Sequence, residues 1–324
     1  NFFEDMILKA PSRNIMNKMA RSTLALYSYD NDPESMSPEH EIDTAVSLIA
    51  KMPVIMICAY ETKRRYFSEE SMIMHPLIKG MSTAENILST LRLDRKFTHD
   101  EAKLLDLMLM LHAEHGGGNN SSFSCRVLTS SGTDPYSAYA AAIGSLKGPR
   151  HGGANRKVTE MHEYIKENVT DWENDDELAD YLRKILRKEA GDGSGLIYGM
   201  GHAVYTLSDP RAVILKEYAG KMAEGTAFEK EFHLLESIER LTPLVFEDVK
   251  HSGKVMCANI DMYSGFVYRM LGIPEELFTP LFAVSRMAGW CAHRFEEINS
   301  GKRIIRPAYK SVSHEKAYVD IKNR

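Results

Sequence analysis

Signals for the start of an α-helix recur along the 324-residue chain, and they restrict its fold more than any other feature. A Ser, Thr or Asp before a helix accepts a backbone hydrogen bond, and a Pro next or a Glu three residues on strengthens the signal. Alternating β-branched runs between hairpin turns, which indicate strands, do not occur. The sequence therefore predicts an all-α fold. Its helix starts are Ser37-Pro38, Ser82 with Glu85, Thr98 with Glu101, Asp134-Pro135 and Thr279-Pro280.

Two of these helices are expected to have particular boundaries. Pro53 has no backbone N–H, so we expect it to end the helix begun at Pro38 and to start another. The segment from Ala102 to Glu114 carries Leu and Met on several faces, which predicts a buried helix. Three glycines stop this helix and leave His115 at its C-terminal end, where the helix dipole would favour the protonated imidazole.

Length and glycine placement indicate two domains. At roughly 150 residues per domain, a chain of this length suggests a pair. The middle of the chain is more charged than its ends, and the glycine-rich turns at 151–153 and 191–201 are potential hinges. We therefore expect a large helical domain made of residues 1–152 and 273–324, and a smaller mobile domain made of residues 153–272.

Composition disfavours several classes of protein. The formal net charge is −5 and no basic stripe dominates, so we expect no nucleic-acid partner. The longest apolar run, Met52 to Tyr60, is shorter than the roughly 20 residues that span a bilayer, so we expect no membrane partner. The chain begins at Asn1 inside an expected helix, and we expect an N-terminal piece to be missing. Four widely spaced cysteines indicate reduced thiols and a cytoplasmic protein: Cys58, Cys125, Cys257 and Cys291.

Four polar residues stand in glycine-rich turns or at helix starts, where they can reach a ligand. His151 is followed by two glycines, and His202 follows another glycine. Arg211 lies just after an Asp-Pro helix start, so its guanidinium and the helix N-terminus together suit a carboxylate or phosphate. Asp261 opens a further helix. Taken alone, these are structural histidines, a solvated arginine and a helix cap. Taken together, they could deprotonate a weakly acidic carbon and bind an anionic molecule for that carbon to attack.

A zinc site is the main alternative for the histidines. His112 and His115 lie three residues apart on a helix, and Glu114, Cys125 or His151 would have to complete the ligands. Because HxxH alone is a weak signal, we expect no metal. The glycines between 191 and 201 follow no strand and lack a GKS or GKT sequence, so we expect no nucleotide-phosphate loop.

Several segments stand in register between about Ser37 and Tyr309. They are His115-Gly-Gly-Gly-Asn119, Leu146–Asn155, Gly199–Tyr205, Asp209–Ala212, Asn259–Gly265 and Arg286–Trp290, followed by Ile-Arg306-Pro307 near the end. Together they resemble the citrate synthase family, whose final arginine motif Ile-Arg306-Pro307 fits. The resemblance implies a helical two-domain fold, a homodimer or multiple of dimers with shared active sites, and closure of the small domain over substrates.

The resemblance also assigns roles to residues. Asp261 would be the base that takes a methyl proton from acetyl-CoA. His151 would donate a hydrogen bond to the thioester oxygen, and His202 would polarise or protonate the ketone of oxaloacetate. The residues that would bind the oxaloacetate carboxylates are His115, Arg211, Arg286 and Arg306, the last from the neighbouring subunit.

The implied activity is that of a Si-type citrate synthase, which condenses oxaloacetate with acetyl-CoA and water to citrate and CoA without a metal or redox cofactor. A 2-methylcitrate synthase that uses propionyl-CoA is an alternative, because one methylene changes discrimination by only about 1–3 kcal/mol. A non-catalytic paralogue with the same fold is another. Two positions depart from the family: Ala203, where many bacterial members have Arg, and Thr206, where the family often places a cation for the CoA phosphate.

Overall fold

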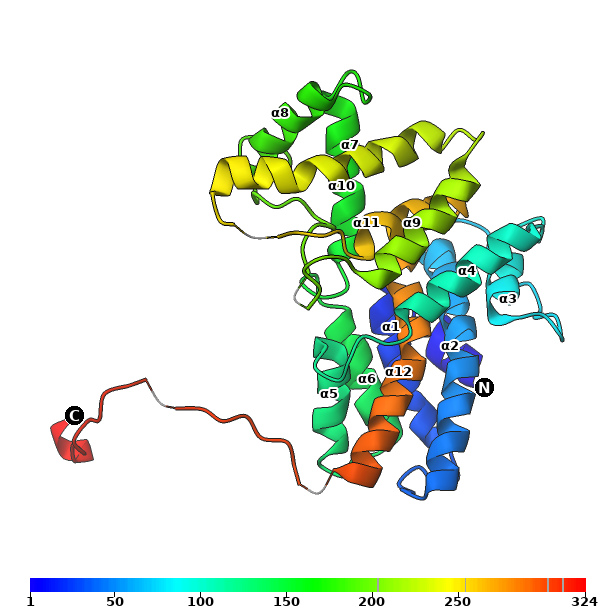
Figure 1. Cartoon of the computed structure of the whole chain (residues 1–324). Coiled ribbons are helices and arrows are strands. Elements are labelled where there is room, and N and C mark those ends of the chain that lie inside the picture. The colour runs from blue at the N-terminus through cyan, green and yellow to red at the C-terminus, as the bar shows by residue number, and fades with distance from the viewer. Residues whose placement is uncertain (203, 254, 302, 311) are drawn as a thin grey trace.

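The chain is a helical molecule without strands in the residues that the computed structural model describes, 1–202, 204–253, 255–301, 303–310 and 312–324 (Figure 1). One isolated antiparallel bridge joins Met200 to Ala258. The predicted all-α fold is therefore confirmed. The α-helices are α1 (Ile15–Ala25), α2 (Pro38–Phe67), α3 (Thr83–Leu91), α4 (His99–His112), α5 (Asn120–Thr129), α6 (Pro135–Leu146), α7 (Ala154–Asn168), α8 (Asp175–Leu186), α9 (Pro210–Ala223), α10 (Glu229–Lys250), α11 (Asp261–Met270) and α12 (Phe278–Ser300). Shorter turns are η1 (Phe3–Leu8), η2 (Leu26–Tyr29), η3 (Glu275–Leu277) and η4 (Ile321–Asn323).

The predicted helix starts follow from local capping. Ser82 and Thr98 both form complete capping boxes. The hydroxyl accepts a hydrogen bond from the backbone N–H of the Glu three residues on, and that Glu side chain accepts one from the backbone N–H of the Ser or Thr. Asp134 accepts from the N–H of Ser137 at 2.8 Å. The start expected at Thr279-Pro280 lies slightly too late, because α12 continues directly from η3 and begins at Phe278.

Pro53 does not divide the second helix, contrary to the sequence-based expectation. α2 runs through it as one helix of 30 residues. A proline inside a helix costs about 3 kcal/mol. Burial of a single large apolar side chain gains about 1.5–3 kcal/mol, and Leu48, Met52, Ile55 and Met56 are all buried around Pro53. Packing against the neighbouring helices therefore outweighs the lost hydrogen bond.

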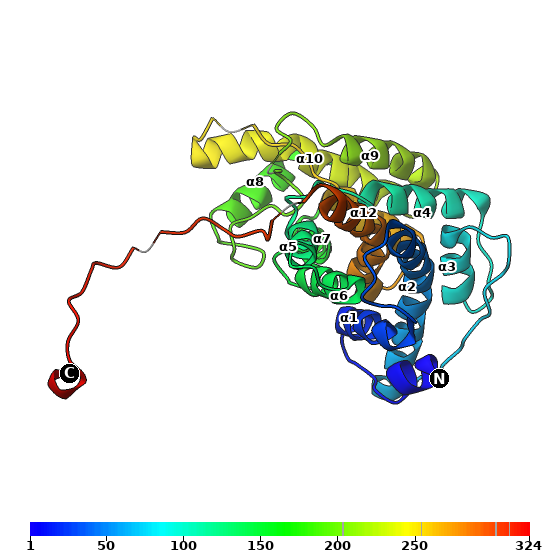
Figure 2. The same cartoon turned by 90° about the horizontal axis from the view of Figure 1, so that it is seen from below.

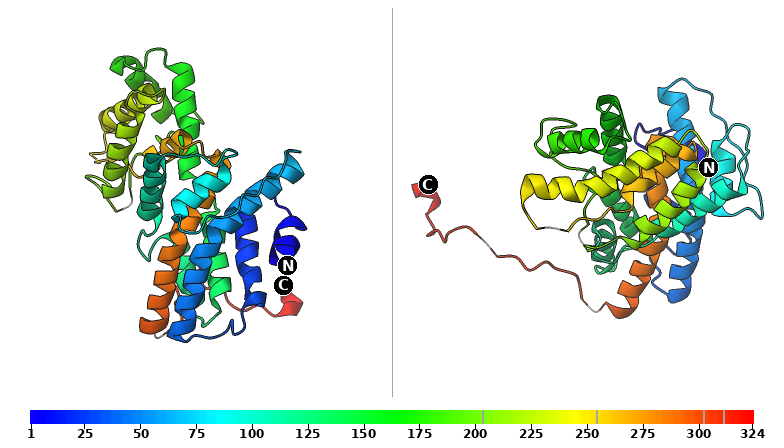
Figure 3. Two further views of the ribbon diagram at one scale, coloured as in Figure 1. Left: turned by 90° about the vertical axis from the view of Figure 1, so that its right-hand side faces the viewer. Right: turned by 45° about the horizontal axis from the view of Figure 1, so that its top comes forward.

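The same helix corrects the expectation about membrane-spanning length. α2 contains an 18-residue window with a mean hydropathy of 1.7, so length and composition alone would allow it to cross a membrane. Half of that window is buried inside the protein. Figures 1 and 3 show α2 lying beside α12, and the two helices are in contact. The apolar residues that make α2 long enough to cross a membrane thus pack, in part, against the neighbouring helices.

The helices fall into two groups in space. α1, α2, α5 and α6 surround α12 in a bundle, which Figure 2 shows nearly end-on. α7, α8 and α10 gather at the opposite end of the molecule, with α9 and α11 between the groups (Figure 1). Most of the described residues after α12 are exposed, and this part of the chain extends away from the helices (Figure 1). The division into domains at residues 152/153 and 272/273 stays a prediction.

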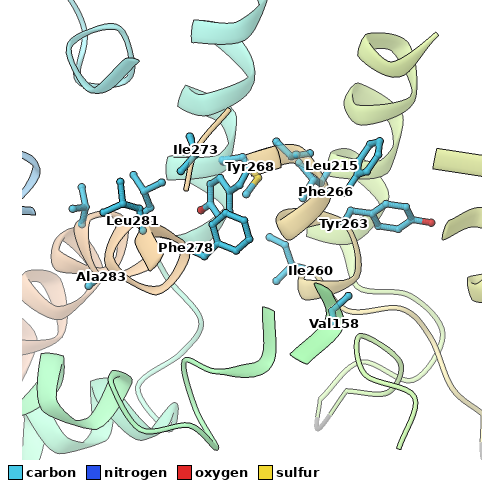
Figure 4. Close-up of a cluster of buried hydrophobic side chains, with 14 of the residues drawn as sticks. Val158, Leu215, Ile260, Tyr263, Phe266, Tyr268, Ile273, Phe278, Leu281 and Ala283 are labelled. Carbon is cyan, nitrogen blue, oxygen red and sulfur yellow. The ribbon is translucent and has the colours of Figure 1, made fainter. Parts of the chain in front are cut away.

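A buried apolar cluster lies between the groups, with side chains from α7, α9, α11 and the start of α12 (Figure 4). Tyr268 and Phe278 belong to it, and their ring centroids lie 5.0 Å apart. Trp290, further along α12, is completely buried in the bundle. α12 therefore links the core of the bundle to the region where the predicted site residues lie.

Candidate active site

A cavity of about 360 Å³ opens where α11, α12, the loop after α4, the turn before α7 and the loop before α9 meet. Six of the seven predicted site residues line it, one from each of six sequence motifs: His115, His151, His202, Arg211, Asp261 and Arg286. The fold thus brings the polar residues of the sequence motifs to one place. Their chemical roles stay predictions, and the geometry below bears on them.

Glycines allow two of these segments to approach each other closely. Gly199 has a φ of +81°, and a Cβ there would lie 2.9 Å from Met262 at the start of α11. Asn259 extends the contact, since its backbone N–H donates to Gly199 O and its side-chain amide donates to Gly201 O, each at 2.9 Å. The loop that carries His202 is thereby tied to the residues just before Asp261.

A second close approach positions His151. A Cβ on Gly152 would lie 2.2 Å from a backbone oxygen of Leu146 and 2.7 Å from Thr279. The Thr279 hydroxyl donates to Gly152 O at 2.8 Å. The histidine turn therefore packs directly on the start of α12, which no larger residue at position 152 would permit.

The imidazole of His151 is held by a serine. Its Nε2 lies 3.0 Å from Ser121 Oγ, which also accepts a hydrogen bond from Trp290 Nε1 at 3.2 Å. The serine proton has two acceptors in reach, Nε2 of His151 and Oδ1 of Asn119, the latter also at 3.0 Å. Burial, and then the positive charge of Arg286, lower the pKa of His151. His151 is therefore a neutral imidazole whose orientation is set by Ser121.

His202 has a defined tautomer. Its Nδ1 accepts hydrogen bonds from the backbone N–H groups of Val204 and Tyr205, each at 3.0 Å. Because an accepting Nδ1 carries no proton, the proton of the neutral ring lies on Nε2. Burial lowers the pKa of His202, which favours this neutral form. The ring therefore offers an N–H donor on its Nε2 side, where Arg211 Nη2 lies 3.5 Å away.

Arg211 is oriented by a buried carboxylate that the sequence interpretation missed. Asp209 is 1% exposed, and its two oxygens accept from Arg211 Nε at 3.0 Å and Nη2 at 2.8 Å. Arg211 lowers the pKa of Asp209 against the effect of burial. The Asp-Pro pair was interpreted only as a helix start, although an Asp two residues before an Arg at such a start could have indicated the ion pair. The guanidinium is thus fixed rather than solvated.

Arg286 is completely buried, and no carboxylate of the described residues forms an ion pair with it. Its Nε donates to His112 O at 2.6 Å, and its guanidinium lies 4.5 Å from the Phe282 ring centroid. Within the described residues, Nη1 and Nη2 have no hydrogen-bond partner. Burial lowers the pKa of Arg286 to about 10, and Arg211 adds to this effect. Arg286 lines the cavity, and two nitrogens of its charged fork have no described protein partner, an arrangement that suits a carboxylate.

Asp261 is not the cap of its helix. Ile260 occupies the N-cap position of α11, and Asp261 is the first helical residue. Asn259 Oδ1 accepts from the Asp261 N–H at 3.0 Å, so an amide takes over the capping task. Burial raises the pKa of Asp261 to about 6, although Arg211 and Arg286 oppose the shift. A carboxylate that is more basic than usual in a cavity is a candidate general base.

His115 differs from its expected environment. α4 ends at His112, so His115 lies in the loop beyond the helix instead of at its C-terminal turn. Burial lowers its pKa to about 4, and Arg211 and Arg286 add to the effect, so the expected protonated form is wrong. Its ring meets that of His202 edge-on at 5.1 Å. His115 is therefore a neutral ligand-binding candidate.

The remaining predicted positions lie apart from this cluster. Arg306 is exposed on the extended chain after α12, and the described lining of the cavity does not include it. Thr206 is exposed, and Ala203 lies outside the described residues. His112 Nδ1 bonds to Met108 O at 2.9 Å. Across the described part of the chain, no three His, Cys, Asp or Glu side chains gather as a metal site would require.

Little in the sequence indicated that the other residues lining the cavity belong to the site. Asn119, Arg150, Asn155 and Asn259 lie inside the quoted motifs, but the motifs alone do not say which of their members face a ligand. Three aromatic residues of the lining, Tyr268, Phe278 and Phe282, were not singled out, because apolar residues on helices usually indicate core packing. Only the packing of α11 on α12 shows that they also form a cavity wall.

Comparison with known proteins points to one family. A family model described as citrate synthase, C-terminal domain, matches residues 1–308. A citrate synthase from Synechocystis is 37% identical over 89% of this chain and 66% of its own length. The 2-methylcitrate synthase 1 of Corynebacterium glutamicum is 34% identical over 92% of this chain and 72% of its own length. The chain thus spans about two thirds of the length of these curated relatives.

Solved structures agree with the sequence comparison. Citrate synthase from Thermoplasma acidophilum, in a ternary complex with carboxymethyl coenzyme A and oxaloacetate, superposes with a TM-score of 0.78 at 26% identity. This match covers all of the present chain and 80% of the other. Citrate synthase from Pyrobaculum aerophilum gives a TM-score of 0.77 at 28% identity, covering 100% of this chain and 77% of the other.

Proposed function

The chain belongs to the citrate synthase family, and we propose that it condenses acetyl-CoA with oxaloacetate and water to give citrate and CoA. The observation that carries the proposal is the meeting of two guanidinium groups with a carboxylate of raised pKa in one cavity. Arg211 and Arg286 suit a dicarboxylate, and Asp261 suits removal of a proton from carbon. The proposed reaction needs all three.

Oxaloacetate would be held by its carboxylates. Arg286 lines the cavity, and its Nη groups have no hydrogen-bond partner among the described residues. Arg211 has its fork oriented by Asp209. A dianion would compensate the positive charge that these groups place in a partly buried site. Neutral His115 would add a hydrogen bond. Acetyl-CoA is a substrate in this scheme, and we propose that no metal or redox cofactor takes part.

Asp261 would take a proton from the methyl carbon of acetyl-CoA. A carboxyl with a pKa of about 6 is mainly ionised at pH 7, yet it is a stronger base than an ordinary aspartate. The negative charge that develops on the thioester oxygen would be stabilised by a hydrogen bond from His151. If the Ser121 proton goes to Nε2 of His151, the ring keeps its own proton on Nδ1 for this purpose.

The new carbon–carbon bond would form between the enol carbon and the ketone carbon of oxaloacetate. The electron pair of the ketone C=O then moves to oxygen, which takes the proton from Nε2 of His202. Two backbone N–H groups hold Nδ1 of this ring, so its proton is directed to Nε2. Water finally cleaves the thioester, releasing CoA as a thiol and leaving citrate.

The direct test is thiol release by the purified full-length protein. We expect release that requires both oxaloacetate and acetyl-CoA, with citrate as the second product. A 2-methylcitrate synthase would instead show the higher kcat/KM with propionyl-CoA, and relatives of both kinds resemble this chain. No release with either thioester would favour the non-catalytic paralogue and contradict the proposal.

We further propose a cytoplasmic homodimer, or a multiple of dimers, in which Arg306 completes the neighbour's site. The exposure of Arg306 on the chain beyond α12 supports a role outside its own cavity. Mixed Arg306→Ala and Asp261→Ala protomers should regain part of the activity, because hybrid dimers would contain one intact site. No recovery despite demonstrated subunit exchange would contradict this role.

We also propose that residues 153–272 close over the substrates. The glycine turn beside His151 supports this, because Gly152 and Gly153 lie where the central segment joins the rest of the chain. Thr206 supplies no cation, so the CoA phosphate would be bound by other basic residues. X-ray scattering should show a more compact protein when oxaloacetate and an unreactive CoA analogue are added. Identical scattering curves would contradict closure.

A further inference from the structure

One wall of the cavity is aromatic. Tyr268 on α11 and Phe278 and Phe282 on α12 line it, and the first two are each 2% exposed. Figure 4 shows Tyr268 and Phe278 side by side where the two helices meet. The charged lining residues Arg211 and Arg286 suit carboxylates. The aromatic wall therefore suits an uncharged apolar group of the substrates, and the acyl chain of the thioester is such a group.

Tyr268 stands on the same helical face as the proposed base. It follows Asp261 by seven residues on α11, which is about two helical turns. Helical side chains lean toward the N-terminus of their helix, so the Tyr268 ring leans along α11 toward Asp261. After burial, the Asp261 carboxylate is the further cause that raises the pKa of Tyr268. The ring therefore borders the space in which Asp261 would meet its substrate carbon.

The ring is confined by its neighbours. It packs on Phe278 at 5.0 Å and stacks on the buried ring of His112 at 6.5 Å. His112 in turn meets Phe282 edge-on at 4.7 Å. Closely packed interiors accept an added methylene only by forcing side chains out of their preferred rotamers. This aromatic cluster consequently fixes the depth of the cavity beside Asp261.

We propose that Tyr268 is a specificity-determining residue, whose ring closes the cavity next to the reacting carbon and favours acetyl over propionyl thioesters. The inference rests on the proposed function. The reacting carbon of acetyl-CoA bears only hydrogens, whereas that of propionyl-CoA bears a methyl group that would meet the ring. Discrimination of a single methylene by an apolar pocket is typically about 10–200-fold in kcat/KM.

The test compares three variants with the unaltered protein. Tyr268→Leu shortens the wall but stays apolar, and Tyr268→Phe removes only the hydroxyl. Tyr263→Leu is the matched control, because Tyr263 is also buried on α11 but bonds to Glu239, and the described cavity lining does not include it. The measurement is kcat/KM for acetyl-CoA and for propionyl-CoA at saturating oxaloacetate, by thiol release.

We expect the unaltered protein to prefer acetyl-CoA by at least about tenfold. Tyr268→Leu should raise the propionyl-to-acetyl ratio by about tenfold or more, while Tyr268→Phe and Tyr263→Leu leave it unchanged. An unchanged ratio in an active Tyr268→Leu protein would overturn the inference. So would equal kcat/KM values for both thioesters in the unaltered protein, even where Tyr268→Leu fails to fold. Absence of thiol release with either thioester would instead overturn the proposed function.

Discussion

Two buried arginines on α12 differ in how far protein groups compensate their charge. Arg286 and Arg294 are both 0% exposed and lie eight residues apart, a rise of about 12 Å. Arg294 lies in the helical bundle, and Glu41 accepts from its Nε at 2.9 Å and from its Nη2 at 2.6 Å. Its Nη1 bonds to Thr129 and to the backbone of Thr133. Each nitrogen of this guanidinium has a partner.

Arg286, at the cavity, has one partner for its three nitrogens. Nε bonds to His112 O, and the other two nitrogens have none among the described residues. Its pKa is lowered by burial, whereas Glu41 offsets burial at Arg294 and raises the pKa there. A buried charge that the protein compensates itself supports the fold. A buried charge left uncompensated is a cost that only a ligand can offset, and this distinguishes a site from a core.

The largest effect should come from the carboxylate at the cavity. Asp261→Asn keeps the size of the side chain but removes the base, so kcat should fall by a factor on the order of 10²–10⁴. Oxaloacetate binding should barely change, since other residues provide it. Kinetics and calorimetric titration would measure the two quantities. Near-normal kcat would refute the assignment of Asp261 as base.

The same variant should be more stable at neutral pH. The pKa of Asp261 is raised in the folded state, to about 6 from the ordinary 3.8, so folding favours the protonated carboxyl. Ionisation therefore lowers the free energy of unfolding as pH rises through that range. Asp261→Asn should gain about 3 kcal/mol at pH 7 and less than about 1 kcal/mol near pH 4. Equal stability at pH 7 would contradict this sign.

At the bundle end, the expected loss is in stability. Arg294→Met leaves Glu41 buried without a partner, which should lower the free energy of unfolding by about 3–5 kcal/mol. The double variant with Glu41→Met should recover most of it. Denaturant unfolding measures both, and kcat of the remaining folded protein should be normal. Loss of activity without loss of stability would remove the contrast between the two arginines.

A smaller change should follow Arg286→Lys. Lysine keeps the positive charge but loses the planar fork, so one charge-assisted hydrogen bond to a carboxylate is lost. We expect the KM for oxaloacetate to rise about 10–100-fold, with the free energy of unfolding changed by less than about 1 kcal/mol. A large loss of stability with an unchanged KM would place Arg286 with Arg294 as a structural residue.

The prediction with the smallest effect at neutral pH concerns the fall of kcat/KM on the acid side of the pH profile. Because Asp261 must be ionised to act, kcat/KM for oxaloacetate should fall about tenfold per pH unit below pH 6. Burial lowers the pKa values of His151 and His202, which favours the neutral form of both rings. A fall centred near pH 4 would show that Asp261 is not shifted by burial.

Local chemistry made the fold class and several helix starts predictable. The capping residues at Ser82, Thr98 and Asp134 act on backbone groups only a few positions away, so the sequence alone determines them. Six of the seven motif residues line one cavity, and their roles stay predictions. Pro53 was misinterpreted because its effect on α2 depends on neighbours from distant parts of the chain.

What the tertiary structure alone decided is the state of each charge. Helix periodicity places Arg286 and Arg294 on the same helix, and only the family resemblance singles out Arg286. The position of Glu41, more than 200 residues earlier, makes Arg294 a structural residue. The low pKa of His115, the raised pKa of Asp261 and the depth of the wall at Tyr268 have the same origin. Burial and charge compensation are sums over segments that meet only in the folded chain, whereas capping and helix periodicity depend on neighbours in sequence.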